Sequence, residues 1–144
     1  MSGEMRVLTV KQPWAWAIIH AEKDVENRSR NLAGSYRGPV AIHAGLGFDQ
    51  GNMASHAHKR AHGTETPTYL AFGAIIGVVD LVAVHFWDEC LEGVFGCSPW
   101  AESDAHHLVL ANPRPLAHPL PFRGGLGLRR LDAATVDLIQ KELP

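Results

Sequence analysis

The run over residues 72–85, FGAIIGVVDLVAVH, constrains the fold more than any other part of the sequence. It is the most apolar stretch of the chain and is rich in β-branched residues, which favour a pleated strand over a helix. We therefore expect a central strand here. Asp80 interrupts the run, and an unpaired carboxylate in a core strand is costly. We expect Asp80 to point outward or to meet an arginine or backbone donors.

The remaining periodicities predict a mixed fold of strands and helices. Strands are expected over residues 5–10, 25–30, 38–44 and 106–110, with an extended edge segment over 119–123 and a last strand after Gly124–Gly127. Helices are expected over residues 13–22, 52–61 and 133–143, the last of them capped by Asp132. A turn is expected over residues 112–115. A long irregular loop is expected over residues 87–104, and long loops in small domains often have a functional role.

Length and composition favour one folded domain spanning residues 1–144. The chain is 46% apolar and 19% charged, which suits a packed core and not a disordered chain. It contains no run long enough to span a membrane, and its first residues lack the apolar core of a signal peptide, so we expect a cytoplasmic location. Cys90 and Cys97 are then expected to be free thiols, with a disulfide as the alternative.

The charges are unevenly distributed although the net charge is only −2. Residues 27–48 and 105–131 contain no acid, whereas residues 61–113 contain no lysine or arginine. If the two acid-free segments share one face, that face suits a polyanion such as RNA. The alternative is that these charges are simply solvated.

The segment over residues 11–30 combines a helix with a group of charges. Pro13 suits the first helical position, because the N–H that it lacks would have no partner there. In the strand that follows, period two places Glu26, Arg28 and Arg30 on one face. Two steps along a strand span roughly 6.6 Å, so Glu26 and Arg28 can act on one small object. Lys23 lies in the turn just before them.

Lys23-x-x-Glu26-x-Arg28 resembles the G-x-K-x-x-E-x-R signature of the ASCH (activating-signal-cointegrator homology) domain family, with Ala21 at the glycine position. The preceding KQPWAWAII and the later HHLVLANPRPLAHPLPFRGGLGL also resemble that family, in the same order along the chain. The resemblance implies an α+β fold: a mixed β-barrel of the PUA-like kind (pseudouridine synthase and archaeosine transglycosylase) with a few flanking helices. It also implies a cleft lined by the three motif residues.

The same resemblance implies RNA or a modified nucleoside as the partner, and it leaves enzyme and binder open. A carboxylate accepts from an exocyclic amine or a ring N–H, and an arginine donates to carbonyl or phosphate oxygens. One hypothesis is a metal-independent ribonuclease acting on single-stranded RNA, with Lys23, Glu26 and Arg28 as catalytic residues. A second is an amidohydrolase of an N4-acylated cytidine, with Lys23 as nucleophile or base. A third is a binding module without catalysis.

Further residues are candidates for ligand contacts. Trp14 falls on the apolar stripe of the helix and is expected in the core, so Trp16 and Trp100 are the better candidates for stacking on a base. His43 and His107 are candidates for general acid–base groups, and two further arginines are candidates for contacts to the ligand. The proposed ligand-binding residues are Trp16, Arg30, His43, Trp100, His107 and Arg114.

Nine histidines also raise the question of a metal. His58 and His62 have the i, i+4 spacing of zinc ligands on a helix, and His56 is close by. The H-E-x-x-H pattern of metalloproteases is absent. We expect no metal and no cofactor.

Overall fold

The computed structural model describes residues 3–49, 67, 69–90 and 97–144. Its strands are β1 (Arg6–Gln12), β2 (Val25–Arg28), β3 (Gly38–Phe48), β4 (Ala74–Phe86), β5 (His106–Pro121) and β6 (Leu128–Arg130). Its helices are α1 (Trp14–His20), the short 3₁₀ helix η2 (Trp87–Glu89) and α3 (Ala133–Glu142). The helix expected over residues 52–61, with His56, His58 and His62, lies outside the described residues.

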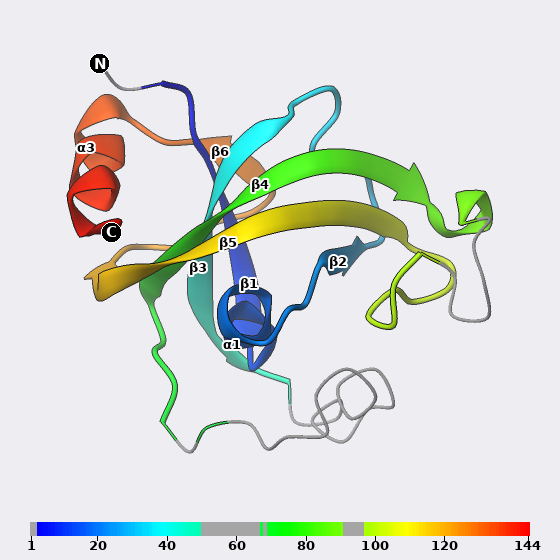
Figure 1. Ribbon diagram of the computed structural model, residues 1–144, viewed down its shortest axis with the longest axis horizontal. Helices are drawn as coiled ribbons and strands as arrows, with labels where there is room; N and C mark the ends of the chain where they lie inside the picture. Colours follow the sequence, from blue (N-terminus) through cyan, green and yellow to red (C-terminus); the bar gives the residue numbers. More distant parts are fainter. Residues whose placement is uncertain (1–2, 50–66, 68, 91–96) are drawn as a thin grey trace.

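The six strands form one sheet in the order β2-β5-β4-β3-β1-β6, in which only β1 and β3 run parallel (Figure 1). Within the described residues no ladder joins the edge strands β2 and β6, so the sheet is open and the expected closed barrel is not observed. Closure needs a ladder between the two edges, and these edge strands are only four and three residues long.

Within the described residues, each face of the sheet is covered by a helix, which explains why β4, apart from Asp80, is largely apolar on both faces. On one face, Ile76 and Val79 of β4 belong to the core cluster that includes Ile18 of α1. On the other face, the alternate residues of β4 pack in the cluster that includes Ile139 of α3. Because β4 lies between β3 and β5 and is covered on both sides, it is the central strand that the sequence predicts.

Asp80 meets an arginine, as one of its two expected arrangements requires. Its Oδ1 accepts from Arg114 Nη2 at 3.0 Å, and its Oδ2 lies 3.3 Å from Asn112 Nδ2. The hydrogen bonds from Arg114 outweigh partial burial and lower the pKa of the Asp80 carboxyl below its usual value. The charge within the central strand is thus paired across to β5.

β5 corrects the prediction of a strand, a turn and a separate edge segment. It is one strand from His106 to Pro121, and it contains the residues expected to form a turn. β2 pairs with β5 only as far as Val109, so beyond that point β4 is the one strand among the described residues that pairs with β5. Prolines are tolerated there because a strand with one free edge does not need every N–H for pairing.

α1 is shorter than expected and begins one residue later. Pro13 precedes the helix as its N-cap, and Ala21 follows it. Ala21 has φ −130°, so the position that is glycine in the ASCH signature does not need glycine here; the positive φ, 60°, falls on Glu22. α3 matches its prediction, because the Asp132 side chain accepts from Thr135 N at 2.7 Å. None of the described helices is long and apolar enough to cross a membrane.

Candidate functional site

The three motif residues are placed by the short connection from α1 to β2. Lys23 follows the helix, and its backbone N–H donates to the carbonyl of Ala17 at 3.0 Å. Glu26 and Arg28 lie on β2, opposite Leu108 and His106 of β5. Because they are two residues apart on a strand, their side chains share one face of the sheet, as the sequence predicts.

Glu26 is held between two cations. Its Oε1 lies 3.5 Å from Lys23 Nζ, and its Oε2 accepts from Arg28 Nε at 2.9 Å. Lys23 and Glu26 are 5% and 7% exposed, whereas Arg28 is half-buried. Two cations around one carboxylate leave a net positive charge in a largely desolvated setting, where electrostatic attraction for an anionic or electron-rich ligand is strong.

Aromatic rings and a backbone carbonyl complete the surroundings of Lys23. Its Nζ donates to the carbonyl of Val25 and lies 5.9 Å and 5.8 Å from the ring centres of Trp14 and Trp100. The two tryptophan rings meet edge to face at 6.2 Å. The faces of such rings attract an ammonium, so this corner holds the lysine charge in place.

Two pockets adjoin the motif residues. The larger has a volume of about 550 Å³, and Lys23 and Trp100 are among its lining residues. The smaller has a volume of about 320 Å³, and it is lined by Glu26, Arg28, Trp14 and the glycine loop at residues 125–127. The motif residues therefore line two pockets, whereas the family resemblance implied a single cleft.

The glycine loop and Gly124 before it lie close to β1 and β3. A Cβ on Gly124 would lie 2.8 Å from His43 Cε1 and 3.0 Å from Thr9 Oγ1, and Gly127 has φ +73°. Only glycine suits both positions without strain. Arg28 Nη2 donates to the Thr9 carbonyl at 2.8 Å, so the loop and the motif meet at the same residue of β1.

No family model matches the sequence, and no curated protein matches it. Among solved structures, the fold is similar to that of ASCH from Zymomonas mobilis, at 15% identity and a TM-score of 0.60, over 97% of this chain and 96% of that chain. A tyrosine-to-phenylalanine mutant of the Zymomonas mobilis protein is similar at 14% identity and a TM-score of 0.59, over 97% and 99%. The chain shares the fold of this ASCH protein. The resemblance inferred from the motifs is thus confirmed at the level of the fold, which is a mixed α+β fold.

Trp14 packs against the main core cluster, as its place on the apolar stripe predicts, but it also contributes to a pocket. It is half-buried, lines the smaller pocket and donates from Nε1 to Asp49 Oδ2 at 3.0 Å. The apolar stripe predicted the buried face of the helix correctly. Trp14 is the first residue of this short helix, so one part of its ring packs on the core and another part lines the pocket. Trp100 is 3% exposed and lies beside Lys23, so it is a wall of the larger pocket.

His43 lies behind the smaller pocket and does not line it. Its Nε2 donates to the Phe122 carbonyl at 2.7 Å, since a carbonyl only accepts, and its Nδ1 accepts from Thr9 Oγ1 at 3.1 Å. Burial lowers the pKa of His43, against the raising effect of the bond to Phe122. The His43 ring therefore supports Thr9 and the glycine loop.

The other predicted contacts lie away from the two pockets. Trp16 packs, half-buried, against the small cluster that contains Trp100. Arg30 is exposed after the end of β2, and Arg114 is paired with Asp80. Among the described lining residues of the two pockets, none of these three side chains occurs.

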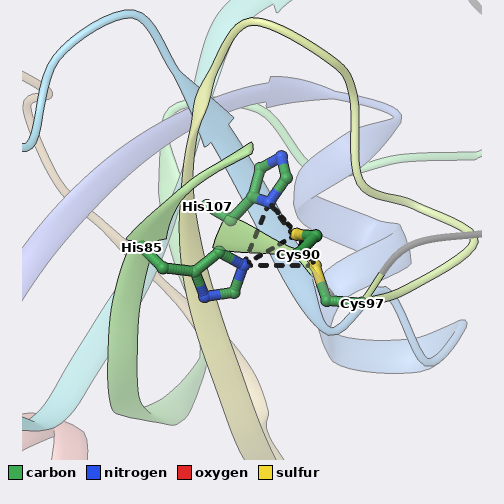
Figure 2. Close-up of side chains that lie close together, drawn as sticks. All are labelled: His85, Cys90, Cys97 and His107. Atoms are coloured by element: carbon green, nitrogen blue, oxygen red, sulfur yellow. Dashed lines mark hydrogen bonds between the residues drawn. The ribbon is translucent and has the colours of Figure 1, made fainter. Parts of the chain in front are cut away.

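His107 belongs to a second cluster, which sequence reasoning missed. It is buried and lies with His85, Cys90 and Cys97, whose ligand atoms converge (Figure 2). His85 and His107 are directly paired residues of β4 and β5. The signal in the sequence was two cysteines enclosed by two histidines, but it appears only once those strands are known to pair.

Proposed function

We propose that this ASCH-fold protein binds single-stranded RNA, or a modified nucleoside, by receiving a base beside Lys23, Glu26 and Arg28. One observation carries the proposal: a buried carboxylate sits between two cations at the junction of two pockets, and each pocket has a tryptophan in its wall. The structural likeness to the Zymomonas mobilis ASCH protein supports the fold, and because the identity is only 15% the ligand is inferred from this chain's own residues.

The smaller pocket has the groups that a nucleobase requires. Glu26 accepts from an exocyclic amine or a ring N–H, and Arg28 donates to a carbonyl or phosphate oxygen. Trp14 offers an aromatic surface for stacking, a contact worth about 1–3 kcal/mol per base. A volume of about 320 Å³ is near the lower end of small-molecule sites, which suits one base better than a large cofactor.

Binding without catalysis fits the surroundings of Lys23 best. Its ammonium contacts the Val25 carbonyl and the Glu26 carboxylate and faces two aromatic rings, an arrangement suited to a fixed positive charge. A nucleophilic lysine must instead be uncharged at the moment of attack. His43 lines neither pocket, so it supplies no acid–base group there.

Ribonuclease activity is the second candidate, and the Glu26–Arg28 pair favours it. A carboxylate can take the proton of a ribose hydroxyl, and an arginine beside it stabilises negative charge that develops on a phosphate. Both groups line the smaller pocket. In this reading Lys23 supplies additional positive charge to the transition state.

Tryptophan fluorescence tests the binding proposal and identifies the pocket. The full chain is titrated at low salt with short single-stranded RNA, nucleoside monophosphates and N4-acetylcytidine. We expect quenching that largely disappears in Trp14→Phe and remains in Trp87→Phe, because Trp87 is a more exposed tryptophan that lines neither pocket. Quenching lost in Trp100→Phe instead would move the ligand to the larger pocket.

Variants of the charged residues separate this site from general attraction to RNA. Glu26→Gln and Arg28→Ala are expected to weaken binding about tenfold or more, equivalent to about 1.4 kcal/mol. Arg37→Ala is the matched control, since Arg37 is exposed and, within the described part of the chain, its hydrogen bonds go to nearby backbone carbonyls. Equal losses in all three variants, or no binding at low salt, would contradict the proposal.

The same mixtures decide between binder and enzyme. Intact RNA after prolonged incubation supports the binding module, and cleaved RNA whose formation requires Glu26 supports the ribonuclease. Release of acetate from N4-acetylcytidine would support the amidohydrolase. Each reaction is run with and without a chelator, and circular dichroism checks that the chain stays folded, because a metal-independent reaction continues in folded protein after the chelator is added.

A further inference from the structure

Four ligand atoms from three separate parts of the chain form a tetrahedron. His85 Nε2, Cys90 Sγ, Cys97 Sγ and His107 Nδ1 have six mutual distances, which are 3.0, 3.2, 3.2, 2.8, 3.3 and 3.4 Å. Four points whose six separations are nearly equal can only be the corners of a near-regular tetrahedron. Figure 2 shows the two rings and the two sulfurs pointing toward one centre.

Hydrogen bonding alone cannot account for six such contacts. His107 Nε2 lies 2.6 Å from the Glu102 carbonyl, which only accepts, so Nε2 carries the proton and Nδ1 of the neutral ring offers a lone pair. The remaining protons are one on each thiol and at most one on His85 Nε2. That leaves about three protons for six contacts, whereas one cation at the centre serves all four atoms together.

We propose that His85, Cys90, Cys97 and His107 bind a zinc ion in a tetrahedral site. The centre of a tetrahedron with edges of about 3.2 Å lies about 2.0 Å from each corner, against about 2.0–2.1 Å for zinc to nitrogen and 2.3 Å for zinc to sulfur. Two sulfur and two nitrogen ligands in this geometry are typical of structural zinc sites. Binding releases the two thiol protons to solvent, and two thiolates balance the dication.

The Glu102 carbonyl is the outer-shell partner that such a site needs. A histidine that ligates a metal generally donates its second ring N–H to a carbonyl or carboxylate, which fixes the ring orientation. His107 has this arrangement, and it is buried at 2% exposure on β5. A buried imidazole with one nitrogen already committed and the other directed at two sulfurs is better explained as a ligand than as a packing residue.

The zinc site secures the segment that carries Trp100. Cys97 is followed by Ser98, whose Oγ donates to Asp24 Oδ1 at 2.5 Å and accepts from Trp100 N at 3.1 Å. The Trp100 carbonyl in turn accepts from Asn27 Nδ2 at 3.0 Å. Zinc therefore joins the end of β4 to the start of β5 and anchors a wall of the larger pocket, outside the pocket itself.

A disulfide between the two cysteines accounts for fewer of the observations. The sulfurs are 2.8 Å apart, whereas a disulfide bond is about 2.05 Å long. Forming that bond would also leave both imidazoles without the sulfur ligands toward which they point. Zinc uses all four side chains, which is why the two hypotheses predict different metal contents.

Metal analysis of the full chain tests the zinc site. The protein is produced under reducing conditions, its affinity tag is removed, and zinc is measured by elemental mass spectrometry. We expect about one zinc ion per chain, falling about tenfold or more in Cys97→Ser and His107→Gln. His106→Gln is the matched control: His106 neighbours His107, but alternation along β5 directs it to the other face, where it contacts Phe86.

A cobalt titration keeps the test decisive if a variant fails to fold. Zinc is removed from the parent chain with a chelator under reducing conditions, and cobalt(II) is added. Tetrahedral thiolate coordination is expected to give strong visible absorption that saturates at about one equivalent and disappears when zinc is added back. Folded, reduced protein that lacks both zinc and this absorption, or a disulfide detected by mass, would overturn the proposal.

Discussion

Glu26→Gln and Lys23→Met are expected to affect stability very differently although they remove the two partners of one ion pair. Glu26 serves both Lys23 and Arg28, at 3.5 Å and 2.9 Å. Replacing Glu26 leaves a buried ammonium without its carboxylate. Replacing Lys23 leaves Glu26 paired with Arg28. The asymmetry follows from the position of the carboxylate between the two cations.

The magnitudes follow from burial. Removing one partner of a buried pair costs about 3–5 kcal/mol, and we expect about 3 for Glu26→Gln, because the amide carbonyl still accepts from the half-buried Arg28. Lys23→Met loses a hydrogen bond to the Val25 carbonyl, worth about 1–3 kcal/mol when its partner stays buried. It also removes the desolvation penalty of the ammonium, which is several kcal/mol, and methionine packs well against Trp14 and Trp100. The net change for Lys23→Met is therefore within about 1 kcal/mol of the parent.

Urea unfolding followed by far-ultraviolet circular dichroism measures both variants without relying on the tryptophans at the site. An unchanged m-value identifies a pure change in stability. We expect Glu26→Gln to be less stable than Lys23→Met by about 2 kcal/mol or more. Equal losses, or a larger loss for Lys23→Met, would show that Lys23 is a structural anchor and would refute this reasoning. Lys23→Met should still weaken ligand binding.

Two further predictions concern the support behind the smaller pocket. Burial lowers the pKa of His43, so the unfolded chain binds a proton at this ring more readily than the folded chain does. The stability that the buried ring contributes is therefore present above about pH 6.5 and is lost as the pH falls below that value. The free energy of unfolding, measured by urea titration, should therefore fall as the pH is lowered from about 7.5 to 5.5. The fall should be less steep in His43→Gln, and equal slopes in the two proteins would exclude His43 as a cause of the pH dependence. Gly124→Ala should cost about 1–3 kcal/mol, because its Cβ would meet the fixed His43 ring, whereas Gly125→Ala meets only the flexible end of Arg129; equal melting temperatures would contradict this.

Local patterns predicted the parts of the site that depend on one segment. Lys23, Glu26 and Arg28 come from a helix end and the strand directly after it, so period two was enough to place the charges together. The cap of α3 at Asp132 is similarly local. Neither conclusion required knowledge of which strands pair.

Tertiary pairing decided the features that the sequence did not reveal. β5 accommodates several prolines because no strand of the described residues pairs with its outer side beyond Val109, which only the strand order shows. The pairing of His85 with His107 likewise depends on the register of β4 and β5, so their approach to two cysteines could not be read from spacing. The open sheet follows from edge strands whose shortness was visible only in the structure.

Nuclear magnetic resonance of the four tryptophan indole N–H groups, during titration with short single-stranded RNA at low salt, tests the central claim most directly. Trp14 lies beside Glu26 and Arg28 at the smaller pocket, and Trp87 lines neither pocket. The account predicts progressive, saturable shifts of the Trp14 signal and of the Gly125 and Gly127 amides, with the Trp87 signal unchanged. Shifts confined to α3 or to Trp87, or an unchanged spectrum, would contradict the binding of a base at Lys23, Glu26 and Arg28.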